Sequence, residues 1–159
     1  MKITEVLVTE HMIFLGVFDQ VERCLRQATT VSEVRTLAGL VQSLLEHHAD
    51  TERNLAYAVL DHVLAERGSL DQMHQEHQEI DQTLRQALTA DEFPVARQSL
   101  RAALSASRRH FCFEEVWVFP LLERVLQPET LEAMGAMWAE SAPMWRSAET
   151  VMEFSKERT

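Results

Sequence analysis

The sequence predicts an all-α fold, an up-and-down antiparallel four-helix bundle with an additional C-terminal helix. Apolar residues recur at intervals of three and four, the period of a helix, along most of the chain. The 159 residues include only four Gly, four Pro and one Tyr, too few for the turns and aromatic strands of an all-β fold. The length suits one core. We therefore expect one domain over residues 1–159, with the bundle at about 4–126.

The first two helices are expected at about residues 4–28 and from residue 30 to about Gly68. Thr30 and Glu33 form a capping-box pattern that opens the second helix. The first apolar stripe also carries His11 and otherwise comprises Phe14, Val17, Phe18, Val21 and Leu25. The second stripe includes two polar residues in core positions and comprises Leu37, Val41, Leu44, His48, Glu52, Leu55 and Val59.

The third helix follows the Gly68-Ser69 break, and its inward stripe comprises Leu70, Met73, His77, Ile80, Leu84 and Leu88. Thr89 with Glu92 resembles a second capping box, so a fourth helix is expected from about residue 92, with Pro94 in its first turn. Its inward stripe comprises Leu100, Ala103, Ser107, His110, Glu114, Trp117 and Leu121. A kink is expected at Pro120, because proline lacks a backbone donor.

A fifth helix is expected at about 128–156, beginning at Pro128. It is rich in large apolar side chains, which suit either a cover over the bundle or the face of a homodimer. These side chains are Met134, Met137, Trp138, Met144 and Trp145.

Charge and cysteine content exclude several classes of partner. Fifteen Lys and Arg against 25 Asp and Glu give a net charge of −10, which disfavours nucleic acid and anionic membranes as partners. No stretch reads as a signal peptide or as an apolar segment of membrane length. Two cysteines are too few for a disulfide scaffold. We expect a cytoplasmic protein with reduced thiols and with neither a nucleic-acid nor a membrane partner.

Polar residues on the inward stripes predict a metal site. His48 and Glu52 are four residues apart, as are His110 and Glu114, so each pair projects from one helix face. Burying two facing carboxylates is costly unless a cation or a shifted pKa compensates, and neutral imidazoles supply no cation. Iron, zinc and copper all suit imidazole ligands. With His11 and His77 the inventory reaches four histidines and two glutamates.

Each of these signals has a simpler interpretation by itself. A lone histidine on an apolar stripe is more often a hydrogen-bonded core residue, and a His-x-x-x-Glu pair is often a contact on a helix surface. The joint occurrence of all six residues at mid-helix is much harder to explain in that way. A helical interaction module without metal would leave two buried glutamates uncompensated.

These motifs resemble the hemerythrin family, specifically the bacterial HHE-type cation-binding proteins, over about residues 5–126. The most specific segments are His-Ala-Asp-Thr-Glu at 48–52 and His-Phe-Cys-Phe-Glu-Glu at 110–115, the latter followed by Phe-Pro at 119–120. Glu-His pairs at 10–11 and 76–77 match the family's other histidine positions. The resemblance implies two non-haem iron ions joined by an oxo or hydroxo bridge. By that resemblance, His11 and His48 bind one iron, His77 and His110 bind the other, and Glu52 and Glu114 bridge them.

The third helix departs from the oxygen-carrying hemerythrins, which have two histidines four apart there. Met73 holds the first of these positions, and a thioether is a poor ligand for ferric iron, so Met73 is expected to pack. His74 lies three residues before His77 and can reach the second iron, the alternatives being a water or an open position. Glu115, five residues after His110, is an alternative bridge. Tyr57 is either a hydrogen-bond donor near the pocket or a packing residue.

Two other histidines are expected to have no direct part in the metal site. His47 lacks a carboxylate four residues on and is expected at the surface or behind the ligands. His62, near the end of the second helix, is expected to be solvated or paired. Neither cysteine has a partner at metal-ligand spacing, and Cys112 is expected to point away from the ligands.

Two classes of function follow from this resemblance. One is a protein that binds dioxygen, or that senses iron, oxygen or nitric oxide, by reversible ligation. The other is a di-iron redox enzyme acting on peroxide or nitric oxide, or an iron-centre repair protein. A bound His74 favours the first class and an open position favours the second, so whether the chain is an enzyme stays open at this point.

Overall fold

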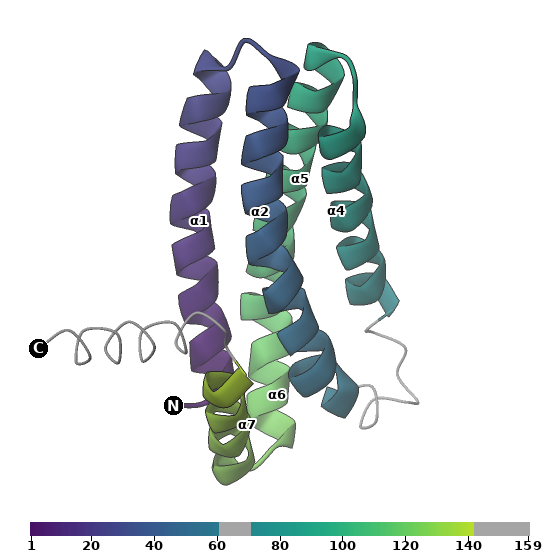
Figure 1. Cartoon of the computed structure of the whole chain (residues 1–159). Helices are drawn as coiled ribbons and strands as arrows, with labels where there is room; N and C mark the ends of the chain where they lie inside the picture. The colour runs from purple at the N-terminus through teal and green to yellow at the C-terminus, as the bar shows by residue number, and fades with distance from the viewer. Residues whose placement is uncertain (61–70, 142–159) are drawn as a thin grey trace, which may run out of the picture.

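The computed structural model describes residues 1–60 and 71–141, and these form a helical bundle without β-strands (Figure 1). The all-α prediction is therefore confirmed for the described segments. The elements are α1 (Ile3–Gln27), α2 (Val31–Thr51), η1 (Glu52–Tyr57), α4 (Asp71–Thr89), α5 (Phe93–Phe113), η2 (Glu114–Val118), α6 (Phe119–Val125) and α7 (Pro128–Ser141). Helices α1, α2, α4 and α5 lie side by side, and α5 continues through η2 into α6 (Figure 1).

One of the two predicted capping boxes is present. Thr30 accepts a hydrogen bond from the Glu33 backbone N–H, and Glu33 accepts one from the Thr30 backbone N–H at 2.9 Å. The box predicted at Thr89 and Glu92 is wrong. Thr89 is the last residue of α4, where its hydroxyl donates to the Arg85 carbonyl at 2.8 Å. Glu92 is instead the N-cap of α5, directly before Phe93 and Pro94.

Two apolar clusters fill the interior, with a polar layer between them. In α1 the sequence passes from Ile3, Val6 and Leu7 of one cluster, through His11, to Phe14 and Phe18 of the other. The same layers occur in reverse order along α2 and η1, in the original order along α4, and in reverse again from α5 through η2 into α6. Each of these helices therefore contributes polar side chains at one common depth.

Both helices that carry a His-x-x-x-Glu motif switch from α-helix to π-helix at the glutamate, at the start of η1 and η2. A π turn places i and i+5 on one face, and single π turns are frequent at functional sites. The inward stripe therefore shifts after each glutamate, and the stripes predicted there are wrong. Trp117 is 65% exposed, and Leu55, Val59 and Leu121 are only partly buried. The residues buried in their place are Ala56, Tyr57, Leu60, Val118, Phe119 and Leu122.

Pro120 follows the η2 segment directly, as the second residue of α6. A π segment begins six residues before the proline, at Glu114, and the kink expected at Pro120 stays a prediction. The expected extension of the second helix to Gly68, and the placement of His62, lie outside the described residues.

Helix α7 packs against the start of α1 (Figure 1). Leu131 and Met134 are buried in the same cluster as Ile3 and Leu7. Gly135 allows this approach, because a Cβ there would collide with the backbone carbonyl of Met1. The described part of α7 thus covers one end of the bundle, while the predicted continuation from residue 142 to 156, with Met144 and Trp145, lies outside the described residues. None of the helices in the described segments is both long and apolar enough to cross a membrane.

Candidate metal centre

Six polar side chains meet in the layer between the two apolar clusters. Each of α1 and α4 contributes one histidine, while α2–η1 and α5–η2 each contribute a histidine and a glutamate. The side chains are almost fully buried, with no residue more than 7% exposed. They are His11, His48, Glu52, His77, His110 and Glu114. The structure therefore brings together six of the seven candidate residues.

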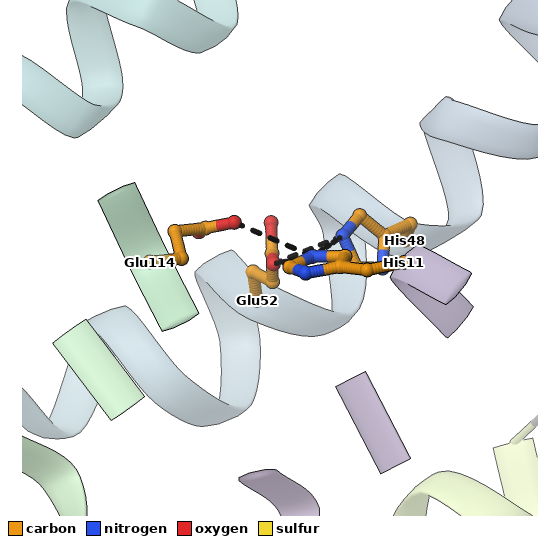
Figure 2. A group of neighbouring side chains, drawn as sticks. All are labelled: His11, His48, Glu52 and Glu114. Carbon is orange, nitrogen blue, oxygen red and sulfur yellow. Dashed lines mark hydrogen bonds and ion pairs between the residues drawn. The ribbon is translucent and has the colours of Figure 1, made fainter. Parts of the chain in front are cut away.

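The histidines form two close pairs. The Nε2 atoms of His11 and His48 lie 3.0 Å apart, and those of His77 and His110 lie 2.8 Å apart. The nitrogen atoms of each pair and one oxygen from each of Glu52 and Glu114 lie within 4.8 Å of one another. Figure 2 shows Glu52 and Glu114 turned toward the rings of His11 and His48. The arrangement offers two neighbouring four-atom groups that share the same two carboxylates.

Each glutamate contacts at least one histidine of each pair. The two oxygens of Glu52 lie 3.0 Å from Nε2 of His48 and 3.2 Å from Nε2 of His77. Those of Glu114 lie 3.5 Å from Nε2 of His11 and 3.4 Å from Nε2 of His110. Both carboxylates therefore span the gap between the pairs.

Three further carboxylates hold the outer nitrogens of the rings. The Nδ1 atom of His48 lies 2.9 Å from Glu10, that of His110 lies 2.9 Å from Glu76, and that of His11 lies 2.9 Å from Glu115. A carboxylate at Nδ1 keeps the proton there and leaves the Nε2 lone pair free for the centre. Two lone pairs that face each other at about 3 Å require a cation or a proton between them.

These three contacts were missed by sequence reasoning, although two of the glutamates belong to the Glu-His pairs of the motif. Glu10 precedes His11 but contacts His48 on α2, and Glu76 precedes His77 but contacts His110 on α5. The signal in the sequence was the repeated Glu-His dipeptide. Glu115 also has this outer role and lies at His11 Nδ1, while Glu114 occupies the buried position between the pairs.

Tyr57 adds a donor inside the centre. Its hydroxyl donates a hydrogen bond to Glu114 Oε1, and its ring stacks on His77 with the centroids 5.6 Å apart. The hydrogen-bonding alternative for Tyr57 is thus confirmed. The π segment that begins at Glu52 explains it, because a π turn brings residue i+5, here Tyr57, onto the same helix face as Glu52. Burial and the neighbouring carboxyl groups of Glu52 and Glu114 raise the pKa of Tyr57, so the phenol stays protonated.

Without metal, protons compensate the buried carboxylates. Burial lowers the pKa of His48, but the charge of Glu52 and the contacts with Glu10 and Glu52 outweigh it and raise that pKa from 6.5 to about 10. Burial raises the pKa of Glu52, but His48 and the neighbouring rings hold it well below its usual range. Burial and the charge of Glu52 raise the pKa of Glu114 well above its usual range. The centre thus holds one ion pair and one neutral acid.

His110, in the other pair, stays neutral. Burial and the nearby imidazole of His77 lower the pKa of His110 to about 4, despite the opposing charge of Glu52. Neutral imidazole is the form that binds metals through its lone pair.

The donor set fits metal ions. Three buried carboxylate oxygens, both of Glu52 and Oε2 of Glu114, lie near imidazole nitrogens of the centre but have no other hydrogen-bond partner among the described residues. No Lys or Arg of the described segments forms an ion pair with the two inner or three outer glutamates. Five carboxylates therefore surround the four imidazoles, and none of the five pairs with a Lys or Arg of the described segments. Two divalent cations would supply the missing charge and occupy the orphaned oxygens.

The remaining candidates lie around this centre. His74 is outside both four-atom groups, and its ring lies edge-on to Tyr57 at 5.6 Å. Met73 is fully buried in the apolar cluster and packs as expected. His47 lies outside both groups, and its Nε2 atom is buried without a hydrogen-bond partner among the described residues. Cys112 is exposed and therefore points away from the centre, as predicted.

A small cavity adjoins the centre. Its volume is about 20 Å³, close to the minimum that holds one water-sized molecule. Its walls combine three of the histidines with mostly apolar side chains from α2, α4 and α5. The lining residues are Leu45, His48, Ala49, His77, Ile80, Asp81, Ser107, His110 and Phe111.

Comparison with known proteins agrees with this geometry. The family model of the hemerythrin HHE cation-binding domain matches residues 2–122. No curated protein and no solved structure matches the chain. The matched segment contains all six buried residues and the three outer glutamates. The chain therefore belongs to the hemerythrin HHE cation-binding domain family, and its buried histidines and glutamates form a candidate metal site.

Proposed function

We propose that this chain is a di-iron protein that binds dioxygen or a related small ligand, such as nitric oxide or peroxide. His11 and His48 hold one iron, His77 and His110 hold the other, and Glu52 and Glu114 bridge them. The observation that supports this proposal most strongly is that each fully buried carboxylate contacts histidines of both pairs. A site for a single ion would not require both carboxylates to span two pairs.

The bundle supplies a rigid setting for such a centre. We take α1, α2, α4 and α5 as an antiparallel up-and-down four-helix bundle, because successive helices cross the three interior layers in opposite order. Packing above and below the polar layer keeps the side chains in place and excludes bulk water. The outer carboxylates fix the ring tautomers, so little rearrangement is needed when metal binds.

Bound ferrous ions would supply electrons to a small ligand, and the mixed imidazole and carboxylate set suits iron. The small cavity beside His48, His77 and His110 has room for one water-sized molecule next to these three rings. Its apolar walls, including Leu45, Ile80 and Phe111, disfavour charged ligands. Tyr57 is the one tyrosine of the sequence, and its hydroxyl donates a hydrogen bond to Glu114.

A redox enzyme acting on peroxide or nitric oxide, or an iron-centre repair protein, is the second candidate. It is favoured by one observation, the position of His74 outside both four-atom groups and edge-on to Tyr57. The second iron would then have fewer protein ligands and an open position for a reactant. A cytoplasmic location and a homodimeric assembly remain further expectations of this proposal.

The optical spectrum separates these candidates. Protein loaded with ferrous iron without oxygen is exposed to air, and the oxygen is then removed. Visible bands that appear with air and disappear on its removal support a binding protein. Irreversible conversion to a ferric form supports redox turnover, and the absence of any iron-dependent band contradicts the di-iron proposal.

A further inference from the structure

The two halves of the centre match residue by residue. Glu52 follows His48 by four residues and Glu114 follows His110 by four, and each glutamate begins a π segment. Five residues after these glutamates, the rings of Tyr57 and Phe119 stack on the histidines of α4 and α1. The centroid distance is 5.6 Å in both cases, with interplanar angles of 22° for Tyr57 on His77 and 26° for Phe119 on His11. The two halves therefore repeat one arrangement of side chains.

The residue after each glutamate breaks this symmetry. Glu115 follows Glu114, and its carboxylate lies 2.9 Å from Nδ1 of His11. The equivalent residue after Glu52 is Arg53, which is 41% exposed and forms an ion pair with Asp50. An arginine cannot accept a hydrogen bond. His77 Nδ1 is accordingly buried without a hydrogen-bond partner among the described residues, unlike Nδ1 of the other three histidines.

This difference affects the tautomer of His77. A neutral imidazole that binds metal through Nε2 must carry its proton on Nδ1. At His11, His48 and His110 a carboxylate stabilises that proton. At His77 the Nδ1–H group would be a buried donor without an acceptor among the described residues, which costs free energy. The other tautomer places the proton on Nε2, next to Glu52 Oε2 at 3.2 Å, and that tautomer cannot bind metal through Nε2.

We propose that the two metal positions are unequal and that the one at His77 and His110 is the exchangeable position. The inference rests on the proposed di-iron function and assigns the order in which the ions leave and re-enter. Loss of an outer hydrogen bond of this kind typically weakens metal binding about 10- to 100-fold. The ion at His11 and His48, where both rings have outer carboxylates, is retained longer.

Position-resolved metal removal tests this order. Crystals of the full chain, loaded with ferrous iron under argon, are soaked in increasing concentrations of a chelator. Anomalous scattering at the iron edge then gives the occupancy of each position. We expect iron to leave the His77 and His110 position first, at a chelator concentration at least tenfold lower. Equal loss from both positions, or earlier loss from His11 and His48, overturns the inference.

A matched pair of variants tests the cause in solution. Glu115→Ala removes the outer carboxylate of His11, and Arg53→Ala truncates the equivalent residue of the other half. Chelator titration with elemental analysis should show two separate steps in the unmodified chain and in Arg53→Ala. In Glu115→Ala the tighter step should weaken about 10- to 100-fold and merge with the weaker one. A comparable weakening by Arg53→Ala contradicts the inference.

Failure of the di-iron proposal is distinguishable from failure of this inference. If the unmodified chain binds fewer than two irons before any chelator is added, the proposed function is wrong. If it binds two irons that leave together, the di-iron centre stands and only the order of exchange is wrong.

Discussion

The segments from His48 to Tyr57 and from His110 to Phe119 share one design but differ in their surroundings. Both place a histidine and a glutamate on one helical turn and then switch to a π turn. Yet the pKa of Glu52 is held well below its usual range by His48, against the effect of burial, whereas burial and Glu52 raise that of Glu114. Spacing along the helix sets where the carboxylates lie, and the neighbours contributed by other helices set which one keeps a proton.

The positions of Tyr57 and Phe119 also combine a shared arrangement with a difference in polar contacts. Each ring stacks on a histidine of a neighbouring helix, so each fills the same volume in its half. Only Tyr57 has a hydroxyl, and it donates to Glu114 of the opposite half. The centre is thus symmetric in packing and asymmetric in hydrogen bonding.

Removing the carboxylate of Glu52 or Glu114 should have the largest effect on metal content, because both carboxylates span the two histidine pairs. We expect Glu52→Ala and Glu114→Ala each to bind at most one iron per chain, measured by elemental analysis after anaerobic loading. The two variants should lose metal to a similar extent despite their different pKa values. Retention of two irons by both variants would show that the bridging assignment is wrong.

Removing the metal should destabilise the whole bundle, since the ions bind the folded chain in preference to the unfolded chain. Metal present at about 1,000 times its dissociation constant adds about 4 kcal/mol to the free energy of unfolding, and its removal should lower Tm by about 10 °C. Calorimetry of loaded and chelated protein measures this difference. An unchanged Tm would indicate that bound metal does not stabilise the folded chain.

The metal-free protein should lose stability as the pH rises, because two groups hold protons more tightly when folded. The raised pKa of His48, about 10 against 6.5, gives a contribution that is fully present below pH 6.5 and is lost as the pH rises through 10. The raised pKa of Glu114 acts in the same direction. Each proton contributes a slope of up to about 1.4 kcal/mol per pH unit.

Urea unfolding of metal-free protein between pH 7.5 and 9.5 measures that slope. His48→Gln should flatten the pH dependence while preserving the fold. A free energy of unfolding that stays constant or rises over this range would mean that His48 is neutral in the folded chain.

Tyr57→Phe makes the two halves alike at this position and should have a moderate effect. It removes the hydrogen bond to Glu114 and keeps the ring, so we expect a loss of about 1–2 kcal/mol in the free energy of unfolding of the metal-free chain. The loaded variant should still contain two irons. A variant as stable as the unmodified chain would show that the hydroxyl does not stabilise Glu114.

Thr30→Ala should have the smallest effect and serves as a control outside the centre. The substitution removes the capping hydrogen bond to Glu33, which typically costs about 1 kcal/mol, and should lower Tm by about 2–4 °C. Its iron content and its chelator titration should match those of the unmodified chain. Loss of iron here would mean that metal retention reports general stability rather than the centre itself.

The sequence was sufficient to predict the six buried residues, because a spacing of four places His48 with Glu52 and His110 with Glu114 on one face. It was not sufficient for the residues that follow. A π turn inserts one extra residue per turn without a clear sequence signature, so Trp117 was expected inside and lies outside. The outer contacts were also missed, because Glu10 and Glu76 contact histidines on neighbouring helices rather than on their own.

The most direct test of a shared dinuclear centre is the count and coupling of bound iron. Chain loaded with ferrous iron under argon and then oxidised is analysed for iron content and by Mössbauer spectroscopy. The bridging arrangement of Glu52 and Glu114 predicts two irons per chain that are magnetically coupled to each other. One iron per chain, or two irons without magnetic coupling, would contradict a shared centre.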